Sequence, residues 1–111
     1  MNTPLMAVVL AAAAFTIGGT AHAEGSASNG QKKTQMCEGC HGIAGFRTAY
    51  PEVYTVPKLG GQSANYIVAA LKAYKSGDRS HPSMRAIAGS LTDQDMADLA
   101  AYYATAEKAA K

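Results

Sequence analysis

The 111-residue sequence has no tryptophan, only two phenylalanines and only two cysteines. Two cysteines cannot form the framework of several disulfides that stabilises many small secreted domains. The chain is long enough for one globular domain, and a domain this small, with so few Trp and Phe side chains, buries little apolar surface by itself. A large apolar group bound inside the domain would supply the missing core.

Charged residues are also scarce. The sequence has 10 Lys and Arg against 8 Asp and Glu, a net charge of +2, and its longest basic run is Lys32-Lys33. Nucleic-acid-binding domains carry a concentrated basic surface, so we expect no nucleic-acid partner. The scattered cations would form at most a weak docking face for another protein.

No Asp, Glu, Lys or Arg occurs in residues 1–23, which end in the small residues Ala21-His22-Ala23. The apolar part of this segment is shorter than the ~20 residues that span a bilayer, which is typical of a secretory signal peptide. We therefore expect cleavage after Ala23, export to the periplasm, and a mature domain of residues 24–111 without stable membrane insertion. An uncleaved amino-terminal anchor is the alternative, because the usual Lys or Arg near the amino terminus is missing.

Helical periodicity is clear after residue 62. Ser63 is placed as a helix N-cap, and Gly77 stands where a C-cap glycine belongs. Between them, Ile67, Leu71 and Tyr74 share one apolar helix face. The spacing predicts a helix between Ser63 and Gly77.

A capping box predicts the start of the last helix. Thr92 is the N-cap, and Asp95 lies three residues further on. Leu91 and Met96 are placed as a hydrophobic staple, and the apolar face continues through Leu99 and the residues that follow it. These signals predict a helix that begins at residue 93.

The other segments are less regular. Residues 29–40 predict a short first helix of poor periodicity, whereas residues 42–61, rich in Gly and Pro, and residues 78–90 predict long loops. No alternating strand pattern of useful length is present. The predicted fold class is all-α, with three to four short helices and long loops.

The residues with the clearest chemistry are Cys37-Glu38-Gly39-Cys40-His41. This spacing is that of a c-type haem attachment site. Positions i, i+3 and i+4 of a helical turn share a face, so both sulfurs can bond the vinyl carbons of one porphyrin while the His41 imidazole points to the iron. A thioredoxin-like redox pair requires a βαβ pattern that is absent, and a zinc site requires two further ligands. We therefore expect one covalent haem c on Cys37 and Cys40, with His41 as an iron ligand.

The second axial ligand has several candidates. A His/Met pair raises the reduction potential, because the soft thioether favours ferrous iron. Met36 is next to Cys37 on the proximal side, and core packing is the simpler role for Met96. Met84 stands in a predicted loop between two helices, from which it can approach the opposite haem face. His81 could compete and give a bis-histidine haem of lower potential.

Beyond the attachment motif, the chain resembles the class I c-type cytochromes, most closely the short bacterial single-haem members and the halves of their two-haem relatives. The resemblance covers about residues 30–103 and includes, in order, Gly30 seven residues before the first Cys, the attachment motif, the Pro-Lys-Leu-Gly-Gly-Gln run from Pro57, and Met84 followed by residues 91–102. It implies the cytochrome c fold wrapped around one haem. It also implies that Met84 is the distal ligand, that the Pro57 carbonyl accepts the ring N–H of His41, and that Gly30 lets the first helix cross the last one closely.

A haem iron with both axial positions filled favours an electron carrier over an enzyme. Its partners would be redox proteins, such as an oxidase, a reductase or a dehydrogenase, met by a monomer in brief encounters. Two alternatives are a haem subunit docked permanently on a catalytic chain and an enzyme or sensor with an open iron site. Arg47, Tyr50 and Tyr54 are candidates for a hydrogen bond to a haem propionate, with loop packing as their simpler role.

Overall fold

The computed structural model describes residues 24–50 and 53–109, so the predicted signal peptide lies outside the described residues. The elements in chain order are α1 (Ala27–Gln31), α2 (Gln35–His41), β1 (Arg47–Thr48), β2 (Tyr54–Thr55), α3 (Ala64–Ser76), α4 (Pro82–Gly89) and α5 (Asp93–Ala109). The two short strands pair antiparallel. The all-α fold class is confirmed, but the described chain has five helices where three to four are predicted.

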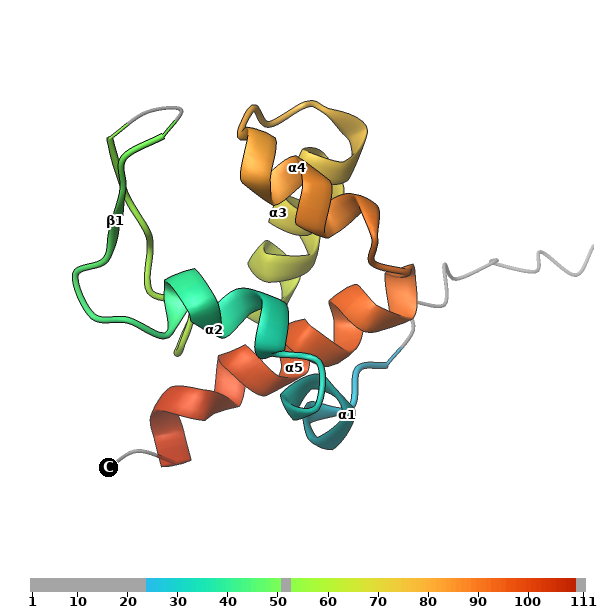
Figure 1. The fold of residues 1–111 in the computed structure, drawn as a ribbon. Helices are drawn as coiled ribbons and strands as arrows, with labels where there is room; N and C mark the ends of the chain where they lie inside the picture. Colours follow the sequence, from blue (N-terminus) through green and yellow to red (C-terminus); the bar gives the residue numbers. More distant parts are fainter. Residues whose placement is uncertain (1–23, 51–52, 110–111) are drawn as a thin grey trace, which may run out of the picture.

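Helix α5 is the element on which α1 and α3 pack. Figure 1 shows α1 against α5 at the base of the molecule, α3 and α4 above it, and the β1–β2 hairpin extended to one side. Helices α1 and α3 both contact α5, and α3 also contacts α4. None of the helices in the described ranges is long and apolar enough to cross a membrane.

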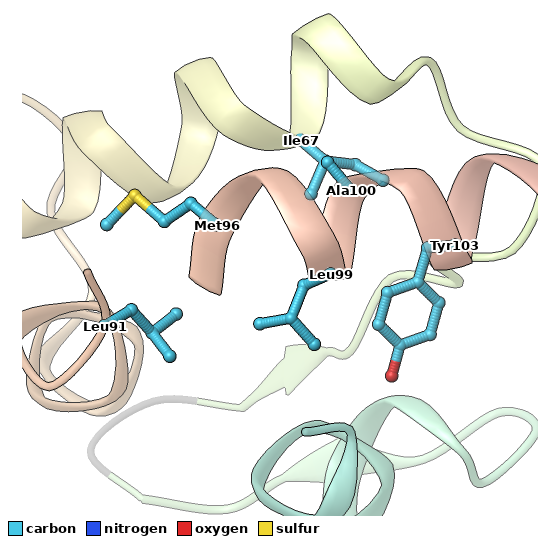
Figure 2. Close-up of a cluster of buried hydrophobic side chains, with 6 residues drawn as sticks. All are labelled: Ile67, Leu91, Met96, Leu99, Ala100 and Tyr103. Carbon is cyan, nitrogen blue, oxygen red and sulfur yellow. The ribbon is translucent and has the colours of Figure 1, made fainter. Parts of the chain in front are cut away.

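The buried core lies mainly on one face of α5. Figure 2 shows the cluster, which consists of Ile67 from α3, Leu91 just before α5, and Met96, Leu99, Ala100 and Tyr103 from α5. The spacing of the four α5 residues places them on one side of a 3.6-residue helix. The core residues predicted from the periodicity of the last helix are confirmed.

Local capping explains where the two longest helices begin and end. The Ser63 hydroxyl accepts a hydrogen bond from the Tyr66 N–H at 3.4 Å, and Gly77 ends α3 with a left-handed φ of 93°. At α5 the predicted capping box is present, because Thr92 N–H donates to an Asp95 carboxylate oxygen at 2.9 Å and Asp95 N–H donates to Thr92 Oγ1 at 3.1 Å.

The prediction of a loop over residues 78–90 is wrong, because most of this segment forms α4. Pro82 occupies the first turn, where its fixed φ suits a helix and its missing N–H costs nothing. The His81 ring supplies the cap, since its Nδ1 accepts the Met84 N–H at 3.3 Å. Histidine is not among the usual N-cap residues, so the sequence pattern did not indicate this helix start.

The predicted first helix is divided into α1 and α2 by a turn at residues 32–34. In this turn Lys33 N–H donates to the Gly30 carbonyl at 2.9 Å, and the Thr34 hydroxyl donates to the Gln31 carbonyl at 2.9 Å. The turn also places the Lys33 ammonium 2.7 Å from a carboxylate oxygen of both Asp95 and Asp98 on α5. Pairing with a distant helix therefore accompanies the break in the local helix.

Gly30 permits the close crossing of α1 and α5. A Cβ at this position would overlap the Asp98 carbonyl oxygen and lie 2.9 Å from the Tyr102 Cβ. The steric reason for a glycine here is confirmed, with the contact centred on Asp98 and Tyr102.

Gly30→Ala is expected to destabilise the protein by at least about 2 kcal/mol, because the added methyl group forces two packed backbones apart. Thermal unfolding followed by circular dichroism measures the loss. Gly89→Ala is the matched control, since a Cβ at that helical position meets no atom within 4 Å. Equal stability of the two variants would contradict the close-crossing explanation.

Candidate cofactor site

Helix α2 presents the attachment motif. It spans Gln35–His41, so Cys37, Cys40 and His41 occupy positions i, i+3 and i+4 of one helix. Both cysteines are free thiols, with Cys37 half-buried and Cys40 exposed. The motif is therefore a single helical surface with two accessible sulfurs and one imidazole.

A hydrogen bond holds the His41 ring. Its Nδ1 lies 2.6 Å from the carbonyl oxygen of Pro57, in the segment between β2 and α3. A carbonyl oxygen can only accept, so Nδ1 carries the proton and donates. This tautomer leaves the lone pair on Nε2, the form in which a histidine binds a metal, and the bond fixes the orientation of the ring.

Met84 and His81 come from the start of α4. Met84 lies in the first helical turn and His81 is the N-cap, so their backbones are fixed together. The His81 ring makes edge contacts with Tyr54 and Tyr74, at centroid distances of 5.6 and 6.4 Å. One nitrogen of His81 and its ring are thus used in structural contacts, whereas no such contact of the Met84 thioether occurs within the described residues.

These side chains surround one cleft. The cleft encloses about 1330 Å³, part of it open solvent at the mouth, and its walls come from α2, the hairpin, the segment before α3, and α3, α4 and α5. Its lining includes Cys37, Cys40, His41, Pro57, Met84 and His81. The predicted attachment cysteines, the iron-ligand candidates His41, Met84 and His81, and Pro57 therefore lie on the same cleft.

The hydroxyl of Tyr103 is buried at this cleft without a hydrogen-bond partner among the described residues. Buried hydroxyls normally have one. Burial raises the pKa of the Tyr103 phenol and of the nearby Cys37 thiol, so both groups are neutral at pH 7. An apolar cleft with an unpaired hydroxyl, two thiols, an imidazole and a thioether fits a large apolar, metal-containing cofactor.

The propionate candidates from the sequence divide into two groups. Tyr54 lines the cleft, but Arg47 and Tyr50 do not, and both are exposed. The structure instead brings Tyr66 and Arg79 to the cleft, which sequence reasoning missed. In the sequence, Arg79 lies between the predicted helix that ends before Gly77 and the candidate ligand Met84. This position is the one signal that could have indicated a place for Arg79 at the cofactor.

Comparison with known proteins settles which cofactor the cleft takes. The family model for cytochrome c matches residues 27–107. The chain belongs to the cytochrome c family. As a member of this family, it binds one covalent haem c through Cys37 and Cys40, the only two cysteines of the sequence.

The sequence of this cytochrome is similar to those of two kinds of relative. It is 38% identical to cytochrome c4 of Pseudomonas aeruginosa over 95% of this chain and 49% of that protein, and 36% identical to cytochrome c4 of Azotobacter vinelandii. It is 41% identical to cytochrome c-554(548) of Halomonas halodenitrificans over 75% of this chain and 99% of that protein. The chain thus spans about half the length of the cytochromes c4 that it matches. The predicted resemblance to class I c-type cytochromes and to halves of their two-haem relatives is confirmed.

Proposed function

We propose that this cytochrome is a periplasmic electron carrier whose haem iron is ligated by His41 and Met84. Bound haem c supplies a one-electron couple between ferric and ferrous iron. The observation that supports the proposal is the shared cleft, on which His41 and Met84 lie together with both attachment cysteines. Cytochrome c relatives favour a carrier over an enzyme.

Each residue has a distinct role in this proposal. Cys37 and Cys40 hold the cofactor to α2, and the Pro57 carbonyl keeps the His41 ring oriented with Nε2 unprotonated. Met84 supplies a soft sulfur ligand from the first turn of α4. The apolar walls of the cleft favour the ferrous state, because the iron–porphyrin core is then neutral, whereas the ferric core carries one positive charge.

The amino-terminal segment is removed after Ala23, and the mature domain works as a monomer in the periplasm. Its partners are redox proteins such as an oxidase, a reductase or a dehydrogenase, met in short-lived complexes. With His41 and Met84 both bound to the iron, no open coordination position would remain for a substrate.

The test uses the protein purified from its native source. We expect a pyridine haemochrome spectrum of the two-thioether type, reversible one-electron reduction, and a single species near the mass of one chain. A protein that lacks haem would overturn the proposal. Co-purification in a stable assembly with a catalytic chain would identify a haem subunit instead of a free carrier.

A further inference from the structure

The charged side chains that line the cleft are all basic. Its lining contains Lys58 and Arg79 but no Asp or Glu. A haem carries two propionate carboxylates on the edge of the porphyrin opposite its vinyl groups. A carboxylate buried without a cation or donor is costly, so the site must supply a partner for them.

Arg79 is held in place by two tyrosines of α3. Its guanidinium carbon lies 4.8 Å from the centre of the Tyr74 ring, and its Nη1 donates to the Tyr66 hydroxyl at 3.2 Å. Within the described ranges, no carboxylate forms an ion pair with Arg79. A guanidinium has five N–H donors, so most of its donor capacity stays available beside the cleft.

Arg79 lies on a different wall of the cleft from the attachment cysteines. The attachment cysteines are on α2, whereas Arg79 lies in the connection between α3 and α4, which Figure 1 shows at the top of the molecule with α2 below it. Thioether bonds to Cys37 and Cys40 would hold the vinyl edge of the haem at α2, so that the propionate edge would face away from this helix. A planar guanidinium can then bind a carboxylate through two parallel N–H donors.

We propose that Arg79, oriented by Tyr66 and Tyr74, binds a haem propionate. This inference rests on the haem protein described under Proposed function. Arg47 and Tyr50, which the sequence suggested for this role, lie outside the cleft lining.

The predicted effect is on the equilibrium between the two oxidation states. The ferrous haem carries one more negative charge than the ferric haem, so a nearby cation favours reduction. Replacement of the cation in Arg79→Gln is expected to lower the ratio of ferrous to ferric protein at a fixed applied potential by about threefold to tenfold, where tenfold corresponds to about 59 mV for one electron.

Arg85→Gln is the matched control. Arg85 belongs to α4 and has the same charge, but it is exposed and does not line the haem cleft. Spectroelectrochemical titration of the holoproteins should show a much larger fall in midpoint potential for Arg79→Gln than for Arg85→Gln. Equal shifts, or no shift, would overturn the propionate assignment while the electron-carrier proposal stands.

Arg79→Lys keeps the test decisive if the glutamine variant does not fold. Lysine keeps the charge but lacks the planar fork, so the haem propionate bending band in the resonance Raman spectrum should shift relative to the unmodified protein. An unchanged band in Arg79→Lys would contradict the proposal. Loss of haem from the unmodified protein and from Arg85→Gln would instead contradict the proposed function.

Discussion

Met84→Ala is expected to remove the near-infrared methionine–iron absorption band and to lower the midpoint potential of the haem. A thioether sulfur is a soft, weak donor that favours ferrous iron, and water or a nitrogen ligand in its place favours the ferric state. The expected fall exceeds about 0.1 V, a fraction of the roughly 0.8 V over which axial ligands set haem potentials. Absorption spectra and a redox titration of the holoprotein measure both effects.

Two further variants separate the ligand candidates. His81→Asn removes the imidazole but keeps a good N-cap for α4, so the methionine–iron band should persist. Met36→Ala removes the second methionine of the cleft lining and should also leave the band intact. A band that survives in Met84→Ala, or disappears in Met36→Ala, would show that Met84 is not the ligand, and absence of the band from the unmodified holoprotein would identify His81 or an open iron site instead.

The second large effect is expected at Asp98. This carboxylate is only 1% exposed, and it accepts hydrogen bonds from Ser26 N–H at 2.8 Å, Gln94 Nε2 at 2.9 Å and Lys33 Nζ at 2.7 Å. Lys33 also pairs with Asp95 at 2.7 Å. One buried carboxylate therefore ties the amino-terminal segment of the domain to α5.

Asp98→Asn is expected to destabilise the folded protein by at least about 2 kcal/mol, because the buried amide loses the charge and cannot accept with both terminal atoms. For a domain of this size the melting temperature should fall by on the order of 10 °C. Asp93→Asn is the control, since the side chain of Asp93 is 76% exposed and lies 3.9 Å from Lys72. Exposed pairs of that kind contribute little, so the control should melt close to the unmodified protein.

The stability that Asp98 contributes is expected to depend on pH. The hydrogen bond from Lys33 holds the pKa of Asp98 below its ordinary value. A carboxyl whose pKa is lower in the folded state stabilises the fold above its unfolded pKa of about 3.9, and this contribution is lost as the pH falls through the folded pKa. The melting temperatures of the unmodified protein and Asp98→Asn should therefore differ fully at pH 7 and converge below about pH 4. A constant difference at all pH values would contradict this account.

Interactions between near neighbours in the chain could be predicted from the sequence. Ser63 and Gly77 bound α3, and Thr92 with Asp95 begins α5, because the capping groups lie within a few residues of the backbone atoms that they satisfy. The attachment motif of residues 37–41 is local in the same way. Its three functional side chains share a face of one helical turn, and the spacing alone predicts a haem site.

Other features depend on residues that are far apart in the chain. The helix α4 begins at an unusual histidine cap, and the turn after α1 allows Lys33 to reach Asp95 and Asp98 more than sixty residues away. Arg79 is an ordinary surface cation in the sequence until the fold places it beside Tyr66 on the haem cleft. The sequence by itself therefore determined the cofactor, its attachment and the main helices, since these follow from short-range spacing. Only the tertiary structure decided which charges are buried together and which side chains surround the cleft, because those contacts exist only after distant segments have packed.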